Sequence, residues 1–410
     1  MPETSTLPGA PARSVPTRWV WLAAWPVTAV FVLSNAATPL YVLWQRDLGF
    51  SKGMLTVIFA AYIVGLLGSL LVSGVLSDRI GRARVLLPAL GLALAACAAF
   101  ATAPGVAALI VARLFTGIAV GAVVSAGMAA VTDVAGPDRK RLAALLASCS
   151  MVFGAGLGPL LAGVLSETLP GPTVTVFVVE AVLLATAMVV VLRMPLPRPA
   201  STGGESTWVR FPRVPSDSRR HLVLGIAVFA PGITATSFVL SLGPSLLSGL
   251  LGSTSRVVAG AMAFAMFLSA TAVQFAVQRM SRLDVLLAGA GSTVGALAFL
   301  IAAVHTASVP LLVAAALLAG AGQGMGQLGG LSLLNSGVPP RRLAEANAAL
   351  NVGGYVPAGI LPVAAGYLSD ASGLAVGATA FGAVLMALAV VGGGLVLSAR
   401  GRTGEAAVPR

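Results

Sequence analysis

Two charged side chains stand inside long apolar runs of this sequence, and their position predicts chemistry. Arg113 lies in the run LIVARLFTG (109–117), and Glu180 lies in FVVE (177–180). Each is about eight residues, or roughly 12 Å of helix, from the nearest polar segment. A carboxyl group buried in a low-dielectric medium favours its protonated form, and it exchanges its proton when a cavity opens beside it. We therefore predict that Glu180 binds a proton and is coupled to Arg113.

Both residues also have a structural interpretation. An arginine at that depth costs about 2.5–3.5 kcal/mol on insertion scales, so it is expected to face a cavity or a partner. Arg113 could instead bond to nearby backbone carbonyl groups, and Glu180 could lie close enough to the membrane surface to be solvated. The sequence leaves these alternatives open.

Polar side chains at helical spacing predict a substrate cavity. Gln323 and Gln327 are four residues apart, as are Asn347, Asn351 and Tyr355 in turn, so each set lies along one helix face. Such faces should point away from lipid, although each amide could instead bond to a neighbouring helix. With one further amide and several aromatic residues they suit a largely apolar small-molecule site. The predicted lining residues are Phe31, Asn35, Phe115, Phe238, Gln274, Gln323, Gln327, Asn351 and Tyr355.

Enzyme chemistry is not indicated. The two histidines, His221 and His305, stand near the ends of apolar runs, and Cys97 and Cys149 have no metal-binding or redox spacing. We interpret both cysteines as small core residues. An enzyme would need a concentrated set of reactive side chains, and an ATP-driven pump would need a phosphate-binding loop. We expect no catalysis, no metal and no cofactor, with the proton gradient as the energy source.

The composition identifies the medium that must surround these residues. The chain is 57% hydrophobic and 9% charged, with a mean hydropathy of +0.96. A soluble domain of this composition would expose far too much apolar surface, so the chain is an integral membrane protein. Its net charge of +12 comes from arginines in short segments between apolar runs, where the positive-inside rule accounts for them. Nucleic acid is therefore not an expected partner.

Twelve apolar runs are long enough to cross a hydrocarbon core of about 30 Å. They lack the alternation of a barrel wall, so they predict an all-α protein with twelve transmembrane helices. The first run has no cleavage pattern and is interpreted as a retained helix. The predicted spans are 19–45, 53–77, 84–103, 105–132, 142–166, 173–193, 221–250, 256–278, 284–304, 308–336, 344–369 and 373–398.

The basic residues set the orientation. With twelve spans, nearly all the arginines fall on one side, and Arg46, Lys52 and Arg256 fall on the other. The positive-inside rule then places both termini in the cytoplasm. We expect a multi-pass protein of a bacterial cytoplasmic membrane, acting as a monomer.

A polar segment rich in Pro, Ser, Gly and Arg divides the spans six and six. We predict bundles at 1–194 and 221–410 joined by a cytoplasmic linker at 195–220. The bundles also resemble each other: Pro159 matches Pro362 and Glu167 matches Asp370, each pair 203 positions apart. A duplicated six-helix unit explains this, and in such transporters the substrate site lies between the halves.

Three motifs give the chain a family resemblance. The segment GVLSDRIGRAR (74–84) resembles the signature G-x-L-x-D-R-x-G-R-x-R of the major facilitator superfamily, between the second and third spans. The run 109–117 resembles the family's arginine motif, and GAGLGPLLAG (154–163) resembles the motif of its drug–proton antiporter branch. The resemblance implies the major facilitator fold, two pseudo-symmetric six-helix bundles.

The motifs also predict the residues that control opening and closing. In the family the 74–84 loop holds the two halves together in the outward-facing state, and Asp133 is an expected partner for Arg82 and a further proton-coupling candidate. Proline kinks a helix and glycine allows close packing, so 154–163 should bend. The arginines of the loop could alternatively serve topology alone. The predicted gating residues are Gly74, Asp78, Arg79, Gly81, Arg82, Gly154, Gly158, Pro159 and Gly163.

The sequence as a whole predicts a secondary transporter that exports a small amphipathic drug or metabolite in exchange for protons. Antiporters of the resembled branch frequently carry a carboxylate in the first helix, whereas here that span offers Asn35 before Asp47 at its end. This departure is why Glu180 is the predicted proton site. A proton-coupled uptake symporter for a sugar or organic acid is the alternative. A receptor would need a sizeable soluble domain, and the longest polar segment is a linker.

Overall fold

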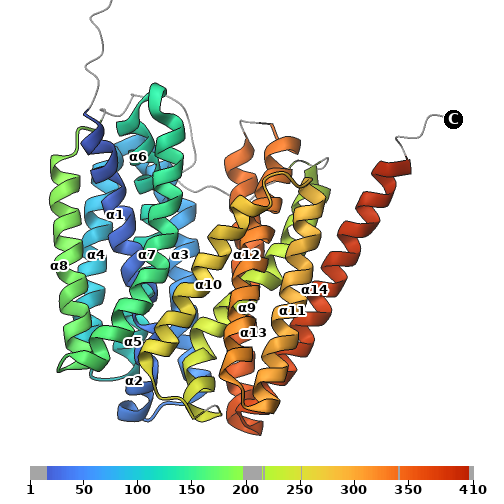
Figure 1. Ribbon diagram of the computed structural model, residues 1–410. Coiled ribbons are helices and arrows are strands. Elements are labelled where there is room, and N and C mark those ends of the chain that lie inside the picture. Colours follow the sequence, from blue (N-terminus) through green and yellow to red (C-terminus); the bar gives the residue numbers. More distant parts are fainter. Residues whose placement is uncertain (1–15, 197–214, 216–217, 251, 340–341, 406–410) are drawn as a thin grey trace, which may run out of the picture.

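The computed structural model describes residues 16–196, 215, 218–250, 252–339 and 342–405, and its regular structure there is helical throughout. Twelve helical segments of this described part are long and apolar enough to cross a membrane. They stand side by side as two bundles (Figure 1). The twelve predicted spans correspond to these segments one for one.

The first bundle contains six spans, two of which have an irregular turn. The first span is α1 (Thr17–Ala36), a 3₁₀ turn (Thr38–Leu40) and α2 (Tyr41–Leu48). The fourth span is α5 (Val106–Ala122), a π turn (Val123–Gly127) and α6 (Met128–Ala135). The other four spans are the single helices α3 (Lys52–Ile80), α4 (Arg82–Ala101), α7 (Lys140–Thr168) and α8 (Pro172–Arg193).

The second bundle has six unbroken helices. They are α9 (Arg219–Gly249), α10 (Arg256–Ala276), α11 (Arg282–Thr306), α12 (Val309–Gly337), α13 (Leu343–Ser372) and α14 (Leu374–Glu405). Most of the predicted linker, 197–214 and 216–217, lies outside the described residues.

Short turns with clear local signals connect the helices that matter for function. Gly81 has φ +100°, a backbone conformation that glycine adopts readily, and it separates α3 from α4. Ser51 and Ser255 cap the N-termini of α3 and α10, their hydroxyl groups accepting hydrogen bonds from the backbone N–H groups of Met54 and Val258. Equivalent helices of the two bundles thus begin in the same way.

The bundles meet chiefly through two helix pairs, α7 with α10 and α3 with α13. We call the end of the molecule with the start of α1, the Gly81 turn and the end of α14 the basic end, and the opposite end, with α2 and the α9–α10 connection, the far end (Figure 1). The basic end carries the arginine-rich turns. These two ends define how a cavity between the bundles is reached.

Candidate substrate cavity and gating contacts

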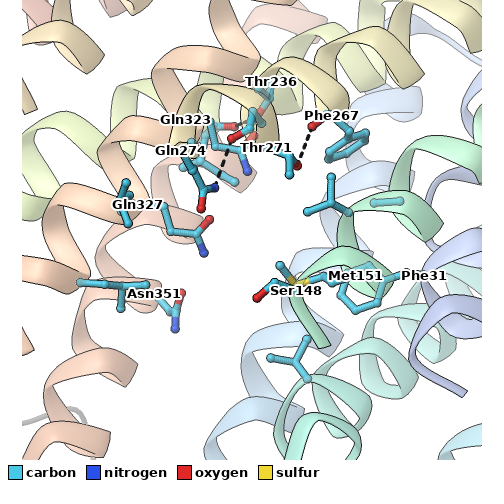
Figure 2. A pocket seen from close by; sticks show the side chains of 18 of the residues that line it. Phe31, Ser148, Met151, Thr236, Phe267, Thr271, Gln274, Gln323, Gln327 and Asn351 are labelled. Carbon is cyan, nitrogen blue, oxygen red and sulfur yellow. Dashed lines mark hydrogen bonds between the residues drawn. The ribbon is translucent and has the colours of Figure 1, made fainter. Parts of the chain in front are cut away.

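A cavity of about 920 Å³ lies between the two bundles. One wall comes mainly from α1, α3 and α7, with single residues of α5 and α6, and the other mainly from α9, α10, α12 and α13, with the start of α11. Figure 2 shows Gln274, Gln327 and Asn351 on one side facing Ser148 and Met151 on the other. The wall is mainly apolar with a small number of amide and hydroxyl groups, which suits a small amphipathic molecule.

Most of the residues predicted to line a cavity do so. The structure brings together Phe31, Asn35, Gln274, Gln323, Gln327, Asn351 and Tyr355 from both halves of the chain. Two of them already have protein partners. The Gln274 amide donates to the Ala270 carbonyl at 3.1 Å, and the Asn35 amide donates to the Ser34 hydroxyl at 3.1 Å. The cavity-facing amides therefore combine helix bonding with exposure to the cavity.

Two predicted lining residues do not line this cavity. Phe238 is fully buried and stacks on Phe381, with ring centroids 4.1 Å apart. Phe115 packs against the hydrophobic core. An aromatic ring is as well accommodated by helix packing as by a ligand, so its presence in a span does not reveal which it contacts.

Cys149 corrects a further expectation. Cys97 is buried as predicted, whereas Cys149 is exposed and lines the cavity. Asn347, on the predicted face with Asn351 and Tyr355, is not among the lining residues.

Several lining residues were not predicted from the sequence. They are chiefly Phe59 and Tyr62 of α3, Thr236 of α9, Phe267 and Thr271 of α10, and the arginines Arg141 and Arg282. Among the described lining residues, the two arginines are the charged ones and no side chain is acidic. Both are exposed at the basic end, so the cavity extends to that end.

Arg113 lies directly behind the cavity wall. Its side chain is fully buried, and Nη1 donates to the Ser34 carbonyl at 2.7 Å. The guanidinium carbon lies 5.0 Å from the ring centroid of Phe59 and 5.1 Å from that of Tyr62. Because Ser34, Phe59 and Tyr62 all line the cavity, one layer of protein separates the guanidinium from it.

Glu180 is buried rather than solvated, with 2% of its surface exposed. Its Oε2 has no hydrogen-bond partner in the described structure. One turn earlier on α8, Phe177 stacks on Phe100 with centroids 4.7 Å apart, which makes the surroundings apolar. Glu180 is not a lining residue and forms no described ion pair with Arg113, so its proton role and its coupling to Arg113 stay predictions.

The α3–α4 turn at the basic end holds a compact charge cluster. Arg82 pairs with Asp133 of α6, Nε to Oδ2, at 3.0 Å, as predicted, and also with Asp78. Its Nη1 further donates to the Ser77 hydroxyl at 2.7 Å. In this conformation the described bonds of Arg82 stay within the first bundle. A role of this turn in holding the bundles together therefore stays a prediction.

The glycines of the 154–163 segment bring α7 close to two other helices. A Cβ at Gly154 would lie 2.6 Å from the Thr28 carbonyl of α1, and one at Gly158 would overlap the Val32 carbonyl. Gly163 instead contacts the backbone of Arg256 in α10. Two of these contacts hold α7 to its own bundle, and the third crosses to the other bundle.

Two matching contacts close the far end between the bundles. Asp370 of α13 accepts hydrogen bonds from the backbone N–H groups of Lys52, at 2.9 Å, and Gly53, at 2.8 Å, at the start of α3. Glu167 of α7 accepts from Arg256 and, at 3.2 Å, from Val257 at the start of α10. Carboxylates are stabilised at helix N-termini, so both contacts favour this closed arrangement.

Comparison with known proteins gives the same architecture. The model of the Major Facilitator Superfamily matches residues 20–283. The crystal structure of the nucleoside transporter NupG superposes with a TM-score of 0.70 at 12% identity, covering 92% of this chain and 98% of that one. A bacterial homologue of the human lysosomal transporter Spinster, in an inward-facing and unoccupied conformation, gives 0.70 at 15% identity, with 94% and 98% covered.

One curated relative matches over a shorter stretch. The 3-(3-hydroxy-phenyl)propionate transporter of Escherichia coli (strain K12) is 39% identical over 100 residues, which span 24% of this chain and 25% of that protein. The match with the family model covers more than half of the sequence. The chain belongs to the Major Facilitator Superfamily of transporters.

Proposed function

We propose that this protein is a proton-coupled secondary transporter that exports a small amphipathic molecule by alternating access. The observation that carries the proposal is the cavity between the bundles, which reaches the basic end while two carboxylate contacts close the far end. Rocking of the bundles would break the far-end contacts and close the basic end. The resemblance of the 154–163 segment to the motif of the antiporter branch favours the export direction.

The basic end is proposed to face the cytoplasm of a bacterial cell, because positive charge is retained on that side of the membrane. Both termini then lie in the cytoplasm, and the protein acts as a monomer. In this orientation the structure is the inward-facing state, ready to accept substrate from the cell interior or the inner leaflet.

Glu180 is proposed as the proton carrier. A buried carboxyl group without an ion pair is far more stable when neutral, and it ionises when water or a cation reaches it. Movement of α8 against α4 would provide that change. Arg113 and Asp133 are further proton-coupling candidates, and the proton gradient is the energy source.

Uptake of an organic acid with a proton is the second candidate. Two observations favour it: the relative from Escherichia coli carries a name that specifies an aromatic propionate, and the charged side chains on the described cavity wall are arginines. Export and uptake share the cavity and differ in the direction in which protons accompany the substrate.

The test uses proteoliposomes that enclose a pH-sensitive dye and contain purified full-length protein. A panel of amphipathic acids, amides and amines is added outside, and internal pH and compound uptake are recorded together. Proton movement opposite to the compound supports antiport, and movement in the same direction establishes the uptake candidate instead. Transport without proton movement, or transport of no compound above protein-free vesicles, would contradict the proposal.

A further inference from the structure

The guanidinium of Arg113 is left with two free donors that point the same way. Nη1 is satisfied by Ser34, but Nε and Nη2 have no partner in the described structure. These two atoms form one edge of the planar guanidinium, and their N–H bonds are parallel. That edge is the fork that binds the two oxygens of a carboxylate.

The neighbouring side chains of Arg113 do not accept hydrogen bonds from Nε and Nη2 in the described structure. Phe59, Tyr62 and Tyr41 present ring faces to the cation, with Tyr41 at 5.7 Å, and π faces stabilise the charge without accepting well-directed bonds. The Tyr41 hydroxyl lies close to the guanidinium, but the two groups do not form a hydrogen bond of good geometry in the described structure. No carboxylate of the described chain forms an ion pair with Arg113. A buried charged donor without a partner is costly, so an anion from outside the chain would be strongly stabilised.

Arg113 is not itself a lining residue, but its neighbours connect it to the cavity. Ser34, Phe59 and Tyr62 touch both Arg113 and the cavity, and Tyr62 is partly exposed. A rotation of its side chain would open the wall at the guanidinium. At the basic end, Arg141 and Arg282 line the entrance, and no described lining residue is acidic. The positive charges at the entrance would attract an anion and repel a cation.

We infer that Arg113 is a carboxylate-binding subsite, and that the substrate is an amphipathic monocarboxylate whose apolar body occupies the cavity while its carboxylate reaches the Nε–Nη2 edge. This inference rests on the proposed function and narrows its substrate class. It holds for either direction of transport. The amides of Gln323, Gln327 and Asn351 line the part of the cavity that the body occupies, so they would contact a polar substituent on a substrate that carries one.

The test compares three probes with one shared body: 3-phenylpropionate, 3-phenylpropanamide and 3-phenylpropylamine. Isothermal titration calorimetry on the purified full-length protein gives each Kd. We expect the acid to bind at least about tenfold more tightly than the amide, with the amine weakest. The preference should change by less than about twofold when salt is raised from about 0.05 to 0.5 M, because a buried pair is poorly screened.

Variants locate the preference. Arg113→Gln should remove it: the Kd of the acid should rise at least about tenfold, while the Kd of the amide changes by less than about twofold. Arg113→Lys should keep part of it, since the charge remains without the fork. Arg46→Gln, at an exposed far-end arginine paired with Asp47, is the matched control and should leave all three affinities unchanged. If Arg113→Gln does not fold, the wild-type protein still tests the subsite, through its preference for the acid over the amide and through the effect of salt on that preference.

Each other outcome has a definite meaning. Equal binding of acid and amide, or tighter binding of the amine, would overturn the carboxylate subsite and leave the proposed transport function standing. A preference that survives Arg113→Gln, or that disappears in high salt and in the double variant Arg141→Gln/Arg282→Gln, would assign it to the entrance and overturn the subsite. Binding of none of the probes would overturn the monocarboxylate subsite, and the proposed transport function would still be decided by the compound panel in proteoliposomes.

Discussion

Gly158 shows how one missing side chain sets the distance between two helices. A Cβ at this position would overlap the Val32 carbonyl of α1, a backbone atom that cannot rotate away. We expect Gly158→Ala to destabilise the protein by about 1–3 kcal/mol, the usual cost of overpacking. The measurement is the midpoint of thermal unfolding in detergent, followed by size-exclusion chromatography.

Gly91 provides the control for that substitution. It lies within α4, and a Cβ added there would have no other atom within 4 Å. Gly91→Ala should be neutral or stabilising by about 0.5–1 kcal/mol, because alanine is the better helix former. Equal midpoints for the two variants would show that the α1–α7 distance adjusts freely.

Glu180 yields a prediction that separates coupling from transport. Glutamine has nearly the same shape as glutamic acid but cannot release a proton, so Glu180→Gln should lose proton-driven accumulation by about tenfold or more. Exchange of labelled for unlabelled substrate across the membrane should continue, because the cavity is unchanged. Both are measured in the same proteoliposomes. Unaltered proton movement in the variant would remove Glu180 from the coupling pathway and leave Asp133 as the next candidate.

Residue type and spacing predicted some of the cavity-lining residues and missed others, for a physical reason. Gln323, Gln327 and Asn351 could be assigned because an amide in a bilayer must face a partner or a cavity, so helical periodicity reveals their common face. Phe238 could not, since a ring that stacks on Phe381 and a ring that faces a ligand have the same sequence signal. Tyr62 was a missed signal: a tyrosine in an otherwise apolar span has a hydroxyl group to satisfy.

At the scale of helices, the two far-end contacts form a matched pair. Each places a carboxylate from one bundle at the N-terminus of a helix in the other, and a glycine four residues before it, Gly163 or Gly366, packs against the same helix start. The match between Glu167 and Asp370 was visible as part of the sequence repeat. Their partners were not, because they lie in the other half of the chain.

Removing both carboxylates should shift the equilibrium toward the state open at the far end. Charge-assisted hydrogen bonds contribute about 1.5–3 kcal/mol each, so Glu167→Gln/Asp370→Asn removes a large bias. Cys149 reports the change, since it lines the cavity while Cys97 is buried. With the basic end facing outward in vesicles, alkylation of Cys149 by a membrane-impermeant maleimide should slow at least about threefold as that end closes.

The control for this double variant is Asp47→Asn, which also removes a far-end carboxylate. Asp47 is exposed, and its described ion pair is with the adjacent Arg46. The rate at which Cys149 is alkylated in this control variant should equal the rate in the wild type. Unchanged or faster labelling in the double variant would show that the carboxylate contacts do not favour the closed far end.

On the scale of the whole molecule, the distribution of charge predicts how the protein sits in the membrane. A protease-cleavable tag at the C-terminus should be cleaved in inverted vesicles and protected in right-side-out ones. In a cysteine-free background, Asp47→Cys at the far end should show the reverse pattern with an impermeant maleimide. The opposite results would place the basic end outside, and the structure would then be the outward-facing state.

The twelve-span architecture was predictable because a long apolar run indicates a helix that crosses the membrane and a short basic turn indicates the side on which two such helices are connected. The α7–α10 and α3–α13 interfaces were not, since lipid-facing and bundle-facing positions in these apolar helices differ little in composition. The hydrophobic residues of α8, for instance, include both exposed Val178 and buried Val176. Contacts between helices far apart in sequence require the fold.

The far-end contacts have a consequence for how this sequence can diverge. Their donors are main-chain N–H groups, which every amino acid except proline supplies, so positions 52 and 257 can change without losing these contacts. Position 53 is more restricted, because a Cβ there would lie 2.6 Å from the Tyr367 ring, and the Arg256 side chain itself donates hydrogen bonds to Ser166. Closure of the far end therefore depends on the two carboxylates, on Gly53, Gly163 and Gly366, and on the Arg256 side chain. After an ancestral duplication, each copy could therefore have acquired its own substrate-contacting side chains while the far-end seam between them was inherited almost unchanged.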